Sequence, residues 1–410
     1  MIDKILNLTN EYENDTVELR RKIHQNPELS HVEYQTSRLV AESLSKLDGN
    51  LELVGDTGIL FTMEGGKAPE PGQKYKTVLL RADMDALPIE EQVESEFKSR
   101  NKGIMHACGH DVHTANLVAV ARVMSRLRGE WSGIVKFLYQ PGEERGAGAR
   151  RMIEGGVLLD PDVDLALALH VMPMDKGLVH LNQGIITACS DGFTLTIRGK
   201  SAHSRKPQQG IDAINIAGHI IVALNSIQGR NLDPFSTATL SVGMVSGGNA
   251  TNVIADMVQL KGIIRSLDGR SREVIRDQIA KISSGIAKAF GGECECVFKD
   301  GYPSVSNSKE AARIVGGLLK DSYNELVSDI DMDSPGETCL EGCVIQDAQP
   351  VMAAEDFGFI SQRVESLYYK VGTGNYGPGH SPTFDVDERW IKFCTRTMVL
   401  ACLKLMEVRE

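Results

Sequence analysis

One short stretch of this chain gathers side chains that bind transition metals. Cys108 is flanked by His106 and His110, and thiol and imidazole groups are ligands that suit zinc and other divalent transition metals. Farther along, the adjacent acids Glu143 and Glu144 follow a Pro-Gly turn. Such a pair could supply both a metal ligand and a general base. These residue types indicate a metal site.

Buried strands are the elements that must bring these residues together. Four short apolar runs end in acidic or imidazole side chains, which in chain order are Asp83 and Asp85, Glu143 and Glu144, His170, and, after a glycine-rich loop, His380. Such runs, separated by helical patterns, predict the strands of an α/β sheet. Ligands in these sheets gather at the carboxyl ends of the strands. Each residue alone could be a helix cap, a turn residue or a core thiol, but their coincidence at strand ends favours a metal site.

The order of the predicted elements indicates two domains. Residues 50–182 alternate strand and helix patterns, whereas residues 184–300 follow the order β-α-β-β-α-β of a ferredoxin-like unit. We therefore expect a catalytic metal-binding domain formed by residues 1–183 and 301–410. The α+β unit at 184–300 would be inserted into it.

Composition narrows the classes of partner. The 410 residues carry a formal net charge of −11, and the basic residues are not clustered, which argues against nucleic acid and anionic membranes as main partners. No stretch is apolar enough to span a bilayer, and the first residues lack a signal-peptide core. The eight cysteines do not form a disulfide framework. We expect a cytoplasmic protein.

A glycine-rich loop suggests a different class of enzyme. Residues 372–377 fit the pattern GxGxxG after a predicted strand, which alone would suggest an NAD-dependent enzyme. A dinucleotide site needs a helix to begin there, so that its N-terminus can hold the pyrophosphate. Pro378 and Pro382 follow instead. We interpret the loop as a tight turn that presents His380.

Taken together, the motifs make the chain resemble the M20 metallopeptidases. The resemblance is strongest to their amidohydrolase subfamily, which includes hippurate hydrolases, indole-acetyl-amino-acid hydrolases and N-acyl-amino-acid deacylases. It spans nearly the whole chain and rests on the motifs at residues 81–88, 105–113, 140–144, 169–171, 201–204 and 380–382. The family resemblance implies an α/β fold, with a mixed-sheet metallopeptidase catalytic domain and an inserted ferredoxin-like α+β domain for dimerisation or as a lid.

The same resemblance implies roles for the residues of the metal site. The ligands of a two-metal centre would be Cys108, His110, Glu144, His170 and His380. Cys108 would be shared between the ions, Glu143 would be the general base, and Asp85 would orient a ligand. The cofactors expected are two divalent ions per subunit, zinc or manganese first, with cobalt or nickel as alternatives.

The inserted domain would supply the substrate contacts. The resemblance implies that His203 reaches the substrate in the active site of a neighbouring subunit of a homodimer, and that Asn252 and Arg265 contact substrate oxygens. His203 or Asn252 could also donate to the oxyanion. The familiar Asn-Val-Ile-Pro appears here with Ala255 in place of the proline.

The expected reaction is hydrolysis of the amide bond of N-acyl amino acids, giving a carboxylic acid and a free amino acid. Glu143 would act as general base on a metal-activated water. A dipeptidase or carboxypeptidase of the same family acting on short peptides is one alternative. A non-catalytic dimeric binding protein that keeps the fold is another.

Overall fold

The structure is a computed structural model of the chain, and it describes residues 1–69, 75–330, 343–346 and 348–407. It divides into two compact units, which are described separately. The first unit comprises Met1–Gly184, Ser306–Gln349 and Asp356–Glu410, and the second comprises Ile185–Val305 and Pro350–Glu355. The second unit is thus inserted in sequence within the first. The segment at 350–355 belongs to the second unit although no sequence pattern indicated it.

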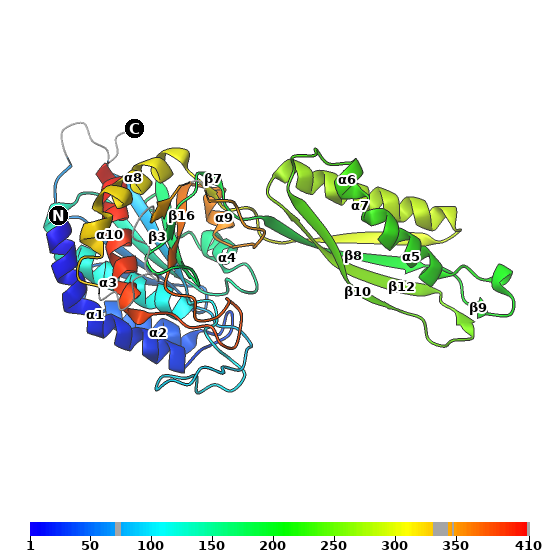
Figure 1. Cartoon of the computed structure of the whole chain (residues 1–410), viewed down its shortest axis with the longest axis horizontal. Helices are drawn as coiled ribbons and strands as arrows, with labels where there is room; N and C mark the ends of the chain where they lie inside the picture. The colour runs from blue at the N-terminus through cyan, green and yellow to red at the C-terminus, as the bar shows by residue number, and fades with distance from the viewer. Residues whose placement is uncertain (70–74, 331–342, 347, 408–410) are drawn as a thin grey trace. The chain divides into compact units, whose positions relative to one another are not determined.

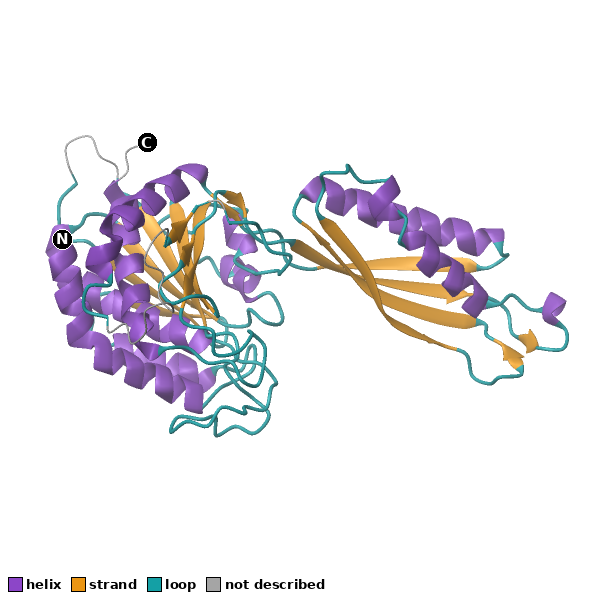
Figure 2. Cartoon of the chain, in the orientation of Figure 1, coloured by secondary structure: helices purple, strands orange, loops and turns teal. Residues whose placement is uncertain are grey.

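The first unit is built on a mixed eight-stranded sheet (Figures 1 and 2). Its strands, in spatial order, are β1 (Asn50–Val54), β2 (Gly58–Glu64), β4 (Ile134–Gln140), β3 (Thr77–Asp83), β5 (Leu165–Met172), β16 (Glu365–Gly372), β6 (Val179–His180) and β15 (Val344–Ile345). The four central strands, β4, β3, β5 and β16, are parallel to one another, whereas β2 and β6 run antiparallel to their central neighbours. Every residue of β3 is buried, as expected for a strand covered on both faces.

Helices cover both faces of this sheet (Figure 2). They are α1 (Ile2–Gln25), α2 (Tyr34–Leu44), α3 (His110–Arg126), α4 (Gly148–Glu154), α8 (Lys309–Leu326), α9 (Gly358–Ser361) and α10 (Ile391–Glu407), with short 3-10 turns η1 (Arg128–Glu130) and η3 (Glu388–Trp390). Helices α1, α3 and α10 pack on one another, while α4 packs on α9. The core between helices and sheet includes Leu80, Phe137 and Tyr369, each at most 1% exposed. Of the helices in the described ranges, none combines the length and apolar character needed to cross a membrane.

The second unit has the α+β arrangement that its element order predicts. Its elements are β8 (Cys189–Arg198), β9 (Ala202–His203), η2 (Pro207–Gln209), α5 (Ala213–Leu224), α6 (Ile227–Arg230), β10 (Ala238–Gly247), β11 (Val253–Ile254), β12 (Met257–Ser266), α7 (Gly269–Ala289) and β13 (Glu293–Asp300). The antiparallel sheet has the order β10-β12-β8-β13, which is the ferredoxin-like order, and α5 and α7 pack against it. Strand β10 lies at an edge. Two further short strands, β7 (Gly184–Ile185) and β14 (Ser306–Asn307), lie where the chain passes between the units.

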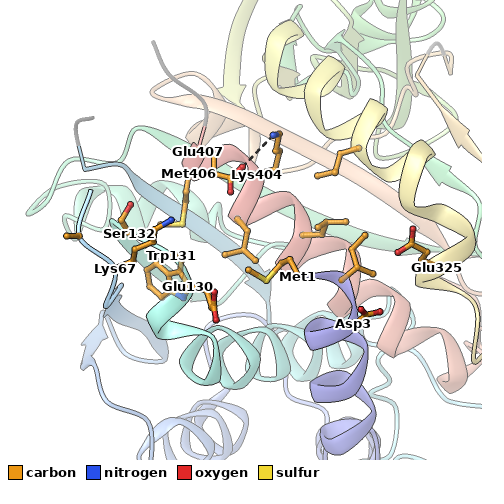
Figure 3. Close-up of a pocket in the computed structure, with 15 residues that line it drawn as sticks. Met1, Asp3, Lys67, Glu130, Trp131, Ser132, Glu325, Lys404, Met406 and Glu407 are labelled. Carbon is orange, nitrogen blue, oxygen red and sulfur yellow. Dashed lines mark hydrogen bonds and ion pairs between the residues drawn. The ribbon is translucent and has the colours of Figure 1, made fainter. Parts of the chain in front are cut away.

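A cavity of about 670 Å³ opens in the first unit beside the ends of α1 and α10 (Figure 3). Its lining combines apolar side chains such as Trp131 and Leu403 with charged ones such as Lys404 and Glu130. None of the predicted metal ligands lines this cavity. The cavity is therefore not the predicted metal site, whose residues follow the central strands of the sheet.

Candidate metal centre

The register of the central strands places the candidate residues at one edge of the sheet. Asp83, the last residue of β3, pairs with Gln140, the last residue of β4. Arg81 pairs with Ala168 of β5, so Asp83 lies level with His170, which in turn pairs with Lys370 of β16. The carboxyl ends of four adjacent parallel strands thus meet where such sheets bind ligands.

The five predicted metal ligands lie together in two groups. The first ligand group is Cys108, His110 and His170, and the second ligand group is Cys108, Glu144 and His380; within each, the ligand atoms lie within 4.8 Å of one another. Cys108 Sγ is 3.5 Å from His170 Nε2, and His380 Nε2 is 3.2 Å from Glu144 Oε1. Because both groups contain Cys108, its sulfur lies where it can contact two ions at once.

Two of the imidazoles are held in the orientation that metal ligation needs. His170 Nδ1 donates to the carbonyl of Val171 at 2.6 Å, which leaves Nε2 facing Cys108. His110 Nδ1 lies 3.3 Å from Asp85 Oδ1. Among the described residues, neither of its buried ring nitrogens makes a hydrogen bond of good geometry. A ring with one nitrogen directed at an oxygen and the other left open is typical of a metal-binding histidine.

His380 is tied to the cysteine loop through its backbone. Its N–H donates to the carbonyl of Ala107 at 2.8 Å, and its φ is +61°. The side chain is 54% exposed. Hydrogen bonds to Cys108 and Glu144 raise the pKa of His380 to about 10. Groups that favour a proton at this position would also attract a divalent cation.

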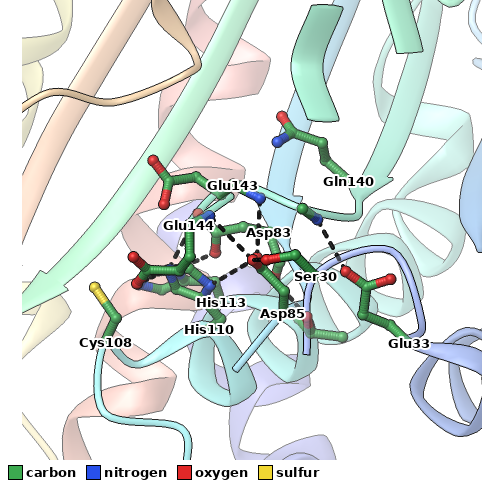
Figure 4. A network of polar contacts seen from close by, with 12 residues as sticks. Ser30, Glu33, Asp83, Asp85, Cys108, His110, His113, Gln140, Glu143 and Glu144 are labelled. Carbon is green, nitrogen blue, oxygen red and sulfur yellow. Dashed lines mark hydrogen bonds and ion pairs between the residues drawn. The ribbon is translucent and has the colours of Figure 1, made fainter. Parts of the chain in front are cut away.

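Two buried carboxylates hold the backbone of the Glu143–Glu144 turn (Figure 4). Asp85 accepts the N–H of Glu143 and the N–H of Glu144, each at 3.0 Å, one on each carboxylate oxygen. Glu33 accepts the N–H of Gly142 at 2.9 Å. Three successive amides therefore donate to two fixed acids. Asp85 thus contacts both His110 and this turn. Glu33 was not predicted from the sequence, because it lies in the loop before α2, far in sequence from the end of any predicted strand.

The Glu143 side chain is 7% exposed and lies beside His110 and Glu144. Its Oε1 is 3.4 Å from the backbone N–H of Asp356. The Asp356 carboxylate accepts from Arg81 Nη2 and from Gln140 Nε2 at 2.9 Å. A buried polar network thus fixes the residue that contacts Glu143.

His110 also belongs to a competing group of possible ligands with Asp83 and His113, but these two residues bind each other. His113 Nδ1 lies 2.6 Å from Asp83 Oδ1, and His113 Nε2 accepts the N–H of Val171 at 2.9 Å. With both ring nitrogens engaged, His113 holds the end of β5 beside His170. Burial acts to raise the pKa of Asp83, but Arg81, His110 and His113 together outweigh it and hold that pKa well below its usual value.

His106 joins none of the ligand groups. Burial lowers its pKa to about 3, so the imidazole is neutral at ordinary pH.

The sequence could have indicated the role of His113, because it lies three residues after His110 and hence on the same side of α3.

The predicted substrate-binding residues all lie in the second unit. Strand β9 pairs with β11 so that His203 faces Val253, and the N–H of Ser204 donates to the carbonyl of Asn252 at 3.0 Å. His203 and Asn252 are therefore neighbours. They lie near the start of β12, where Met257 pairs with Arg198, whereas Arg265 lies near its other end and pairs with Ser190. Arg265 Nη1 donates to the carbonyl of Met352 at 2.7 Å.

Comparisons of sequence and of structure match most of the chain to proteins of one family. The model of peptidase family M20/M25/M40 matches residues 79–404. Thermostable carboxypeptidase 2 of Saccharolobus solfataricus is 36% identical over 415 residues, covering 98% of each chain. Hippurate hydrolase of Campylobacter jejuni is 33% identical over 371 residues, covering 90% of this chain and 89% of the relative. The crystal structure of the Bacillus subtilis YXEP protein, a dinuclear metal binding peptidase from the M20 family, matches with a TM-score of 0.79 at 27% identity, covering 98% of this chain and 100% of that one.

Proposed function

The chain belongs to peptidase family M20/M25/M40, and from this premise we propose that it hydrolyses the amide bond of N-acyl amino acids, releasing a carboxylic acid and a free amino acid. The resemblance inferred from the motifs is confirmed. The protein is an enzyme of a family that acts on amide or peptide bonds. The observation that carries the proposal is the pair of ligand groups that share Cys108, with the Glu143 carboxylate beside them.

The donor set fits two divalent ions. Cys108, His110 and His170 would hold one ion, and Cys108, Glu144 and His380 would hold the other. Ions bound there polarise a carbonyl oxygen and lower the pKa of water. Thiolate and imidazole donors favour zinc over magnesium, and manganese, cobalt and nickel also suit such a set.

Glu143 is the residue that we assign to proton transfer. Its carboxylate would take a proton from the attacking water and then deliver that proton to the leaving amine. The amide of Asp356 at 3.4 Å and the hold of Asp85 on the Glu143 backbone keep this carboxylate in place. Glu144 would serve as a ligand, because its Oε1 lies against His380.

A homodimer would complete the site. His203 and Asn252 lie at one end of the second unit and Arg265 at the other. Arg265 lies eight residue steps along β12 from its first residue, Met257, and at about 3.3 Å per step that is roughly 26 Å. One substrate of amino-acid size cannot span this separation. We therefore assign His203 and Asn252 to the site of the neighbouring copy, where they would donate to the developing oxyanion.

The edge strand of the second unit supports the same assembly. Strand β10 is unpaired on one side among the described strands, and its Met244 and Val245 are 62% and 60% exposed. An exposed apolar edge of ten residues is a surface that proteins usually cover. A second copy of the chain could cover it by pairing with β10.

The relatives favour two substrate classes. One is a hippurate hydrolase, whose name implies an N-acyl amino acid, and another is a carboxypeptidase. We place N-acyl amino acids first and short peptides second, because the metal centre could cleave the amide bond of either. The arginine fork of Arg265 suits a substrate carboxylate in both cases.

A substrate panel tests the proposal. Protein loaded with zinc or with manganese is assayed on benzoyl and acetyl amino acids and on dipeptides. We expect hydrolysis that chelation abolishes and added metal restores. The variant Glu143→Gln should keep its metal and lose at least about a hundredfold in rate, while Glu144→Gln should lose metal affinity. Binding of acyl amino acids without turnover by the metal-loaded protein would instead favour a non-catalytic binding protein.

A further inference from the structure

Arg20 lies in α1, outside every motif that carries the family resemblance, yet its guanidinium is 1% exposed and surrounded by acids. Its Nε donates to Asp111 Oδ2 at 2.6 Å. Its Nη1 donates to Glu388 Oε1 at 3.1 Å, and its Nη2 lies 3.5 Å from Asp385 Oδ1. The ring of Phe97 lies 4.7 Å from its Cζ. Burying a charged side chain is costly even when it has partners, so we expect Arg20 to have a role beyond stability.

The partners of Arg20 belong to the two segments that carry metal ligands. Asp111 directly follows His110 in the first turn of α3 and is fully buried. Asp385 and Glu388 end the stretch that begins at His380. His110 belongs to the first ligand group and His380 to the second. Both segments therefore meet at the planar fork of Arg20, whose donors are fixed relative to one another. Arg21, the next residue of α1, also binds Glu388, at 2.6 Å, but Arg20 is the one that binds Asp111 as well.

We propose that Arg20 is a positioning residue of the metal centre, holding the segments of His110 and His380 at the spacing that two ions require. The inference rests on the proposed function for the identity of the ligands. Arg20 itself touches neither ions nor substrate. Its effect passes through Asp111 on one side and through Glu388 on the other.

A second buried arginine provides a matched control. Arg396 in α10 is 0% exposed and binds Asp329 through two nitrogens, at 2.6 and 2.9 Å. It also contacts α1, through Thr9 at 2.9 Å. None of its partners lies in a segment that carries a predicted ligand. Replacing Arg396 should therefore disturb folding as much as replacing Arg20 does, without a direct path to the ligands.

The experiment titrates Zn²⁺ into metal-free wild type, Arg20→Met and Arg396→Met, in the presence of a competing chelator, and records each melting temperature. Both variants should melt at lower temperature. Only Arg20→Met should weaken Zn²⁺ binding, by about 10- to 100-fold and in both binding steps, as for other residues that orient metal ligands. Equal affinities in the two variants, whether unchanged or equally reduced, would overturn the proposal. Wild type that binds no Zn²⁺ would instead count against the proposed function.

Glu388→Gln keeps the shape of the side chain and removes the charge that Arg20 and Arg21 both bind. It therefore tests the contact of α1 with the His380 side of the centre if Arg20→Met does not fold. Since Glu388 follows the His380 segment, one of the two binding steps should weaken and the other should stay within about threefold of wild type. Wild-type affinity in both steps would overturn the proposal. The conservative variant Arg20→Lys should recover little, because a lysine ammonium cannot bind Asp111 and Glu388 in the same fixed geometry.

Discussion

Asp85 illustrates how one carboxylate can control two neighbouring residues with different tasks. It accepts the amides of Glu143 and Glu144 on separate oxygens and also lies 3.3 Å from His110 Nδ1. Burial acts to raise the pKa of Asp85, but the His110 contact and the Ser30 hydroxyl lower it more, so the carboxylate is charged. A charged acceptor makes stronger hydrogen bonds to the turn than a neutral one. The adjacent glutamates can therefore differ in role because their backbone is fixed.

His24 gives a pH dependence at the residue scale. Burial and Arg20 lower its pKa, but Asp111 at 2.8 Å and Glu91 at 3.2 Å outweigh them, so the folded-state pKa is raised above about 6.5. The charged form is favoured in the folded state. This stabilisation is fully present below about pH 6.5 and is lost as pH rises through the raised pKa.

The variant His24→Gln tests this expectation. It should be destabilised by about 3–5 kcal/mol at pH 6, the scale of a broken buried pair, and by less as pH rises. Melting temperatures of wild type and variant from pH 6 to pH 9 measure the difference. A difference that grows with pH would contradict the assignment, and Lys22→Gln, on the same helix but 57% exposed, is the control.

At the scale of elements, the turn at residues 141–148 depends on the glycine at its start. Gly142 has a φ of +65°, and a Cβ added there would lie 2.4 Å from the His31 ring. Gly142→Ala should therefore strain the turn, costing at least about 1 kcal/mol for the left-handed backbone alone, and should lower the hydrolytic rate at least about tenfold because Glu143 follows directly. Gly129→Ala, where an added Cβ meets nothing within 4 Å, should leave rate and melting temperature unchanged. Full activity in Gly142→Ala would show that the turn need not be rigid.

The sequence predicted the elements well wherever a local pattern decides the structure. The central strands carry continuous apolar runs, and α3 (His110–Arg126) carries buried apolar residues at helical spacing. The short strands β6 and β15 have two residues each, too few for a periodic signal. Strand β6 pairs with the edge of β16, and β15 pairs in turn with β6. The helices and strands of the second unit followed from alternation and helical spacing.

The site could be predicted only in part. Residues at strand ends were found because topology brings strand ends together. Glu33 and Arg20 were not, because each acts from a helix or loop through a carboxylate or guanidinium whose partner is distant in sequence. Glu33 and Gly142 are 109 residues apart, and Arg20 and Glu388 are 368 apart. No local pattern marks such a pair.

At the scale of the whole molecule, the assignment of His203 to a neighbouring copy predicts complementation. The inactive variants Glu143→Ala and His203→Ala are refolded together. Random pairing makes roughly half the dimers mixed, and in each mixed dimer one site carries both defects and the other none, so about a quarter of normal activity should return. If His203 served its own chain, no activity would return. A chain that sediments as a monomer at assay concentration would also contradict the prediction.

The position of β16 between β5 and β6 has a consequence for biosynthesis. A ribosome makes residues up to His170 early and delivers β16 and His380 only after the whole second unit has been synthesised. Until then the central sheet lacks a strand from its middle, and the second ligand group lacks its histidine. The nascent chain can fold its inserted unit first, because that unit has a core of its own. On the proposed function, the second ligand group could therefore be completed only after the whole second unit and His380 have been synthesised, so metal loading would follow the synthesis of both units.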